Sequence, residues 1–130
     1  MHKLILPLLI LAMAVPALAR HEHPERYYQK LWCDRQSGVM EVVMPSGSRC
    51  DCLTESHAVE FDFAPKWAES VGQALNYAAQ TGRKAGVVLI VEKPADRRHV
   101  QQILIVKRYN SLDMDVWLVD AEGNDLGEVR

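Results

Sequence analysis

Residues 57–67 read His-Ala-Val-Glu-Phe-Asp-Phe-Ala-Pro-Lys-Trp, and this stretch decides the fold. Apolar and acidic side chains alternate along its first half, which is typical of a β-strand with two different faces. Glu60 and Asp62 fall on one face, and the other face carries Val59, Phe61 and Phe63. A proline then begins a helix over residues 65–80. The stretch therefore predicts an acidic strand that runs directly into a helix.

Further helices and strands are predicted on both sides of this unit. A non-alternating β-branched run over residues 86–91 predicts a strand that is buried on both faces. Residues 103–106 fit either a helix or a strand. The predicted order is helix 24–35, strands 39–44, 49–54 and 57–63, helix 65–80, strand 86–91, helix 96–109, strand 114–119 and a polar tail over residues 120–130. This order predicts a small α/β fold with a mixed central sheet flanked by helices.

Length and composition limit the class of protein. A chain of 130 residues has room for one domain. With 48% hydrophobic and 25% charged residues, its composition is that of a globular protein and excludes a disordered chain. A formal net charge of -2 argues against a protein that holds nucleic acid by bulk electrostatic attraction.

The N-terminus has the layout of a secretory signal peptide. Lys3 precedes an apolar run over residues 4–15, and Ala17-Leu18-Ala19 is a small-x-small cleavage pattern. We therefore expect residues 1–19 to be a cleaved signal peptide and residues 20–130 to be the single domain, periplasmic or secreted and not inserted in a membrane. An uncleaved membrane anchor is the alternative.

Carboxylates are predicted to gather on one patch of the sheet. Asp51 lies in the strand over residues 49–54, which precedes the strand of Glu60 and Asp62. If the two strands are neighbours, all three carboxylates can converge. Like charges in close proximity are costly unless a positive group joins them, and Mg²⁺ prefers oxygen ligands. The alternative is an edge hairpin whose outer face is simply solvated.

The following helix carries a polar stripe. With 3.6 residues per turn, Lys66, Gln73 and Tyr77 fall along one side of it. A separate apolar stripe consists of Trp67, Val71, Ala74, Leu75 and Ala78. Because Lys66 lies in the first turn, directly after the acidic strand, its side chain can reach back to the carboxylates.

Asp51, the Glu60-x-Asp62 pair and the Gln73-x-x-x-Tyr77 helix, in this order, resemble the PD-(D/E)XK nuclease superfamily. The stretch is most similar to its Holliday-junction-resolvase-like and RecB-like members, which carry such a helix. The resemblance implies a restriction-endonuclease-like α-β-β-β-α-β core over residues 24–91, followed by a C-terminal helix and strand.

The resemblance also implies a role for each residue. Asp51 and Glu60, with the backbone carbonyl of Phe61, correspond to the ligands of the divalent cation. Asp62 stands where the family motif has lysine, and it implies a proton acceptor or a ligand of a second cation. Lys66 is the candidate for the displaced lysine. Gln73 and Tyr77 correspond to the residues that support the site and contact the substrate backbone, and Glu25 is a candidate for the glutamate that several members carry on the first helix.

Two functions follow from these assignments. The first is an exported, Mg²⁺-dependent nuclease that hydrolyses phosphodiester bonds of DNA or RNA. The alternative is a catalytically inactive nuclease-fold protein that acts as a periplasmic binding or structural module. The acidic set favours the first, and the export signal favours the second.

The cysteines predict one disulfide. Export makes oxidation available. Cys50 and Cys52 are two residues apart on a strand, so we expect both on the face opposite Asp51. Cys33, near the end of the first helix, is expected to bridge to Cys50 or Cys52, and the third cysteine to remain a buried thiol. The alternative is three buried thiols.

Overall fold

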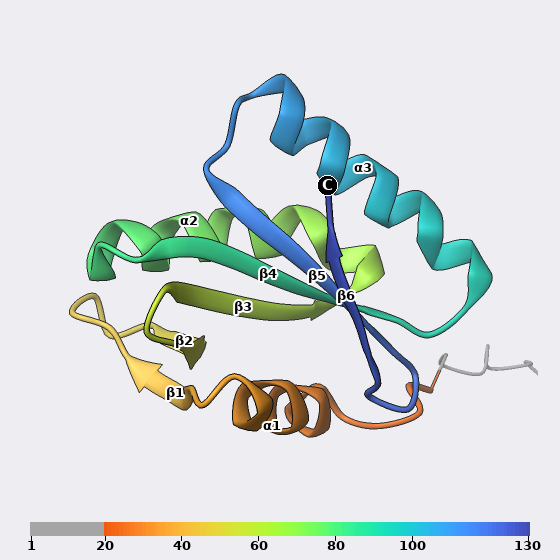
Figure 1. Ribbon diagram of the computed structural model, residues 1–130, viewed down its shortest axis with the longest axis horizontal. Helices are drawn as coiled ribbons and strands as arrows, with labels where there is room; N and C mark the ends of the chain where they lie inside the picture. Colours follow the sequence, from red (N-terminus) through yellow and green to blue (C-terminus); the bar gives the residue numbers. More distant parts are fainter. Residues whose placement is uncertain (1–19) are drawn as a thin grey trace, which may run out of the picture.

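The computed structural model describes residues 20–130, so the predicted signal peptide lies outside the described residues. The described residues form an α/β fold with a mixed central sheet flanked by helices, as the sequence predicted (Figure 1). They contain three α-helices and six strands, one strand more than predicted. Two 3₁₀ turns, η1 and η2, precede the second and third helices. In chain order the elements are α1 (Glu25–Arg35), β1 (Val39–Val43), β2 (Arg49–Leu53), β3 (His57–Phe63), η1 (Ala64–Lys66), α2 (Trp67–Thr81), β4 (Lys84–Val91), η2 (Pro94–Asp96), α3 (Arg97–Tyr109), β5 (Met114–Asp120) and β6 (Asp125–Val129). Among the described residues, no helix has the length and apolar character needed to cross a membrane.

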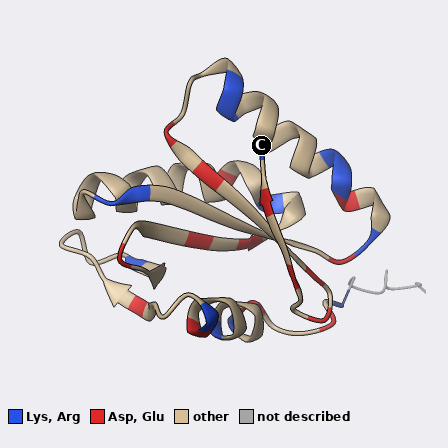
Figure 2. Ribbon diagram, viewed as in Figure 1, with Lys and Arg blue, Asp and Glu red and all other residues tan. Residues whose placement is uncertain are grey.

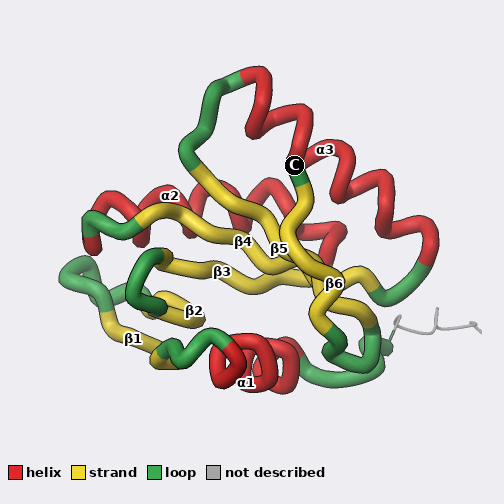
Figure 3. The backbone as a smooth tube through the Cα atoms, viewed as in Figure 1, coloured by secondary structure: helices red, strands yellow, loops and turns green. Residues whose placement is uncertain are grey.

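The strands lie in the sheet in their chain order. β4 runs parallel to both β3 and β5, and the other neighbouring pairs are antiparallel. The helices α1 and α2 lie on opposite faces of the sheet, and α3 lies on the same side as α2 (Figures 1 and 3). β4 supplies both cores: Val88 and Ile90 pack toward α1, and Val87 and Leu89 toward α2 and α3. The prediction of a strand buried on both faces is confirmed.

The prediction of a polar tail over residues 120–130 is wrong, because residues 125–129 form β6. The carboxylate of Asp120 accepts the backbone N–H groups of Glu122 and Asn124, and Gly123 adopts a φ of 87°. These features close a tight hairpin after β5. Residues 103–106, which fit either a helix or a strand, lie in α3.

The ribbon of β1 and β2 is joined to the rest of the sheet over a short distance. β2 pairs with β3 only at Cys52↔Val59 and Leu53↔Ala58. Within the ribbon, Glu41 lies opposite Asp51 and has a φ of 54°, a conformation that side-chain-bearing residues rarely adopt in a strand. The sheet is therefore kinked and opened at Asp51.

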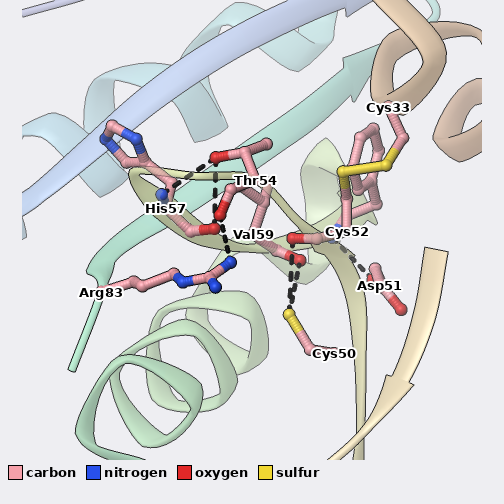
Figure 4. The surroundings of a disulfide bond; sticks show 9 residues. Cys33, Cys50, Asp51, Cys52, Thr54, His57, Val59 and Arg83 are labelled. Atoms are coloured by element: carbon pink, nitrogen blue, oxygen red, sulfur yellow. Dashed lines mark hydrogen bonds between the residues drawn. A yellow bond between two sulfur atoms is a disulfide. The ribbon is translucent and has the colours of Figure 1, made fainter. Parts of the chain in front are cut away.

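A disulfide joins Cys33 of α1 to Cys52 of β2, with Cα atoms 5.8 Å apart, which confirms one of the two predicted pairings (Figure 4). Cys50 is a free, buried thiol. The prediction that Cys50 and Cys52 share the face opposite Asp51 is wrong for Cys50. Its side chain packs with Ala58 and with Tyr77 of α2, because the ribbon is kinked at Asp51, between the two cysteines.

Candidate functional site

Four carboxylates come together where β2 leaves β3. They are Glu25 of α1, Asp51 of β2, and Glu60 and Asp62 of β3, and we call them the carboxylate cluster. Asp51, Glu60 and Asp62 are buried, with 9%, 6% and 6% of their surfaces exposed, and Glu25 is half-buried. Figure 2 shows acidic positions on α1, β1 and β3.

Asp51 is fixed at the opening between the two strands. Its Oδ2 accepts a hydrogen bond from the backbone N–H of Phe61 at 2.8 Å. In a continuous β-ladder, a backbone carbonyl of the neighbouring strand would accept this N–H group. Here the side-chain carboxylate of Asp51 accepts it instead. This bond sets the side chain of Asp51 beside that of Glu60, the residue that precedes Phe61.

Asp51 and Glu60 form a close carboxylate pair. Burial raises the pKa of Asp51, and the charges of Glu41 and Asp62 add to this effect. Burial raises the pKa of Glu60 more strongly, followed by the charge of Asp51. Glu60 Oε2 is buried and has no hydrogen-bond partner among the described residues. The pair therefore holds at least one proton near neutral pH unless a cation replaces it.

Asp62 and Glu25 lie next to the pair. Burial, followed by the charge of Glu25, raises the pKa of Asp62 to about 6. Burial, followed by the charge of Asp51, raises the pKa of Glu25, and a 2.9 Å hydrogen bond from Gln29 opposes this effect. Two carboxylates with raised pKa values thus border the Asp51–Glu60 pair.

Lys66 supplies positive charge at the edge of the cluster. It is exposed at the end of η1, and its charge lowers the pKa of both Asp62 and Glu25. Two further basic side chains, Arg83 and Lys84, are engaged elsewhere. Arg83 donates to the carbonyl of Thr54, and Lys84 forms ion pairs with Asp115 and Asp113.

Of Gln73 and Tyr77, the two motif residues on the polar stripe of α2, Tyr77 lies near the carboxylate cluster. Tyr77 is buried, and burial followed by the charge of Glu60 raises the pKa of its hydroxyl. Gln73 is exposed and makes no side-chain hydrogen bond within residues 20–130. The structure thus brings Asp51, Glu60, Asp62, Lys66 and Tyr77 together, and leaves Gln73 outside this contact network.

Sequence reasoning missed one acid. Glu41 of β1 contributes to the raised pKa values of Asp51 and Glu25, and it forms an ion pair with Arg49 at 3.7 Å. A single glutamate among apolar residues of an edge strand gave no signal of this position. The kink at Glu41, which only the folded backbone reveals, accompanies its approach to the cluster.

The donor set suits a hard cation that takes few protein ligands. Within residues 20–130, no three His, Cys, Asp or Glu side chains are arranged to hold a metal ion. Mg²⁺ commonly binds one or two carboxylates and keeps waters or substrate oxygens as its other ligands. The buried and unpartnered Glu60 Oε2, beside Asp51, fits such a two-carboxylate site.

A separate cavity of about 680 Å³ lies between α3 and β6. It is lined by apolar side chains and by both basic and acidic ones, including Arg97, Glu92 and Asp120. None of the cluster carboxylates lines it. The carboxylate cluster therefore lies at the opening between β2 and β3, apart from this cavity.

Comparison of the chain with protein-family models, with curated proteins and with solved structures found no significant match.

Proposed function

We propose that the carboxylate cluster is the active site of a metal-dependent nuclease of the PD-(D/E)XK type, which hydrolyses phosphodiester bonds of DNA or RNA. One observation carries the proposal: Asp51 and Glu60 are buried in contact, on neighbouring strands, and one oxygen of Glu60 lacks a partner. A buried pair of carboxylates is costly without a cation or a shared proton. The presence of such a pair favours a chemical role over a structural one.

The order of helices and strands supports assignment to the restriction-endonuclease-like fold. The segment from α1 to β4 follows the α-β-β-β-α-β order of the restriction-endonuclease-like core. In that core the acidic residues lie on the second and third strands, as Asp51 and Glu60 do here. In this proposal α3, β5 and β6 are additions to the core.

Asp51 and Glu60 would hold the divalent cation, for which Mg²⁺ is the candidate, with the backbone carbonyl of Phe61. When bound, the cation lowers the pKa of its water and neutralises charge on the phosphate. Asp62 would accept the proton of the attacking water, because a pKa of about 6 keeps it mostly ionised at neutral pH and still basic enough to act.

Lys66 would stabilise the negative charge that develops on the phosphate, in place of the lysine that Asp62 displaces. Its position beside Asp62 and Glu25 supports this role. Tyr77 would orient Glu60, and the exposed Gln73 would contact the substrate backbone. Glu25 adds a fourth carboxylate to the site.

Export of the chain is part of the proposal. The Cys33–Cys52 disulfide supports an oxidising compartment, periplasmic or extracellular, because such bonds are rare in the cytosol. Residues 1–19 would direct this export and be removed. The substrate would then be nucleic acid outside the cytoplasm.

Cleavage assays test the proposed function. Purified, oxidised protein is incubated with supercoiled plasmid and, separately, with single-stranded RNA, each with Mg²⁺ or with EDTA. We expect cleavage with Mg²⁺, none with EDTA and none for Asp51→Asn, while Asp113→Asn, a change of an exposed aspartate, cleaves normally. Absence of cleavage of both substrates would reject the nuclease and favour the inactive binding module, for which the Asp62 departure from the family motif argues.

A further inference from the structure

One end of the disulfide and one member of the carboxylate cluster lie on the same short strand, β2. Cys52 directly follows Asp51, so the bridge to Cys33 anchors the residue next to the carboxylate (Figure 4). The bridge is also tightly enclosed: a Cβ atom at Gly38 would lie 2.6 Å from Cys52 Sγ and 2.8 Å from Cys33 Sγ. The position of Asp51 and the integrity of the bridge are therefore linked through one peptide unit.

Without the bridge, the ribbon of β1 and β2 would be weakly attached. β2 has two ladder pairs with β3, and the N–H of Phe61 bonds to Asp51 instead of to a backbone carbonyl. The remaining contacts with α2 are the small apolar cluster around Cys50 and Tyr77 and one hydrogen bond from Ser46 N to Gln80.

The helix at the other end of the bridge is held independently. The Tyr28 hydroxyl donates to the carbonyl of Ala121 at 2.8 Å, and Arg35 donates to the carbonyl of Gly123 at 3.0 Å. Tyr28 and Trp32 are also buried in the main core. Loss of the bridge should therefore leave α1 in place and free the ribbon, because the ribbon has the weaker remaining contacts.

We propose that the Cys33–Cys52 disulfide is a redox latch that closes β2 onto β3 and so assembles the carboxylate cluster only in an oxidising compartment. A dithiol reductant opens the latch by giving two electrons and two protons to the sulfur–sulfur bond. The bond breaks, Cys33 and Cys52 become thiols, and the reductant closes into its own disulfide. Asp51 then moves away from Glu60 with the ribbon. Control of hydrolysis by this latch rests on the proposed function, but the opening of the strands does not.

Cys50 reports on the latch without any assay of activity. Its thiol is buried between β2 and β3, where it donates to the carbonyls of Cys52 and Val59. Oxidised wild type and the Cys33→Ser/Cys52→Ser variant each contain one free thiol, that of Cys50. Their rates of reaction with 5,5′-dithiobis(2-nitrobenzoate) can therefore be compared directly.

We expect Cys50 to react about tenfold faster or more in the variant. The rate should change little with low concentrations of urea, since a local opening exposes little surface. Equal rates in a folded variant would overturn the latch, and so would a rate that rises steeply with urea, because the thiol would then react through global unfolding.

If the Cys33→Ser/Cys52→Ser variant fails to fold, hydrogen exchange on wild-type protein before and after reduction provides a second test. We expect the amides of Phe61 and of the ribbon to lose protection, while those of β4 over Val87–Ile90 keep it. Equal loss at all these amides would overturn the latch. Because neither measurement involves nucleic acid, opening without any nuclease activity would reject the proposed function alone.

Discussion

The carboxylate of Asp51 accepts the backbone N–H of Phe61 at 2.8 Å, across the opening between β2 and β3. The bond satisfies an amide that would otherwise lack a partner in this part of the sheet, and it brings Asp51 against Glu60. One side chain thus serves both the fold and the candidate site. It also determines which substitutions can separate the two roles, because asparagine retains an oxygen that can accept the bond and alanine does not.

We predict that Asp51→Asn abolishes Mg²⁺-dependent cleavage and leaves the fold intact. The amide oxygen can still accept the N–H of Phe61, but the charge that would hold the cation is lost. A loss of about a hundredfold or more in cleavage rate is expected. Circular dichroism and urea unfolding check the fold.

Asp51→Ala is the matched comparison for this prediction. It should also lose activity and in addition be destabilised by about 1–3 kcal/mol, because the buried N–H of Phe61 loses its acceptor. If the asparagine variant cleaves DNA as fast as wild type, the activity belongs to another site.

The stability of the protein should fall as the pH rises from about 4 to 7. The folded state raises the pKa values of Asp51, Glu60 and Asp62, the last to about 6. In this range the folded chain therefore binds more protons than the unfolded chain, so raising the pH favours unfolding. We expect the free energy of unfolding to decrease by about 2 kcal/mol across the range, after allowance for screening by solvent.

Urea unfolding in metal-free buffer at several pH values measures this slope. A free energy of unfolding that increases from pH 5 to pH 7 would contradict the raised pKa values and the burial of the cluster.

Glu60→Gln should stabilise the metal-free protein at pH 7, by about 1–2 kcal/mol. At pH 7 the wild-type chain must bind a proton at Glu60 when it folds, because burial raises the pKa of this group, and the neutral amide avoids that cost. The gain should shrink toward pH 5, where the unfolded chain binds this proton more readily. Glu55→Gln, in the exposed β2–β3 turn, is the control and should change stability by less than about 0.5 kcal/mol. A Glu60→Gln protein that is less stable than wild type at pH 7 would show that the buried Glu60 does not destabilise the wild-type protein.

Mg²⁺ or Mn²⁺ should raise the melting temperature of wild type at pH 7. A ligand that binds only the folded state at a hundred times its Kd adds about 2.7 kcal/mol. Asp51→Asn should lose most of this effect, because one of the two proposed ligands is gone. Differential scanning fluorimetry with and without the metal measures the shift, and an equal shift in both proteins would place the cation elsewhere.

Gly38→Ala should destabilise the protein by about 1–3 kcal/mol, because the added Cβ meets both sulfur atoms of the bridge. Gly72→Ala is the matched control, since a Cβ there meets nothing within 4 Å. Gly72 lies in α2, where alanine is the better helix former, so this change should stabilise by about 0.5–1 kcal/mol. Chemical unfolding of both variants, under oxidising conditions, makes the comparison. Equal stability of the two variants would show that the disulfide can shift to accommodate the added Cβ atom.

Local patterns accounted for most of the elements. Alternation along residues 57–63, the apolar run of β4 and the proline that precedes α2 each indicated an element that the structure contains. The strand β6 was missed because its few residues are mostly polar and exposed, and because the hairpin before it depends on side-chain bonds from Asp120. A short edge strand of this kind is specified by its partner strand more than by its own pattern.

The sequence by itself determined the acidic face of β3 and the helix that follows it. Backbone periodicity fixes these features over a few residues, so they can be read locally. Only the tertiary structure decided that Cys52 is bridged and that Cys50 turns toward Tyr77. It also decided the raised pKa values in the carboxylate cluster. These features depend on the kink opposite Glu41 and on where β2 leaves β3, and both result from contacts between segments far apart in the chain, which no local pattern encodes.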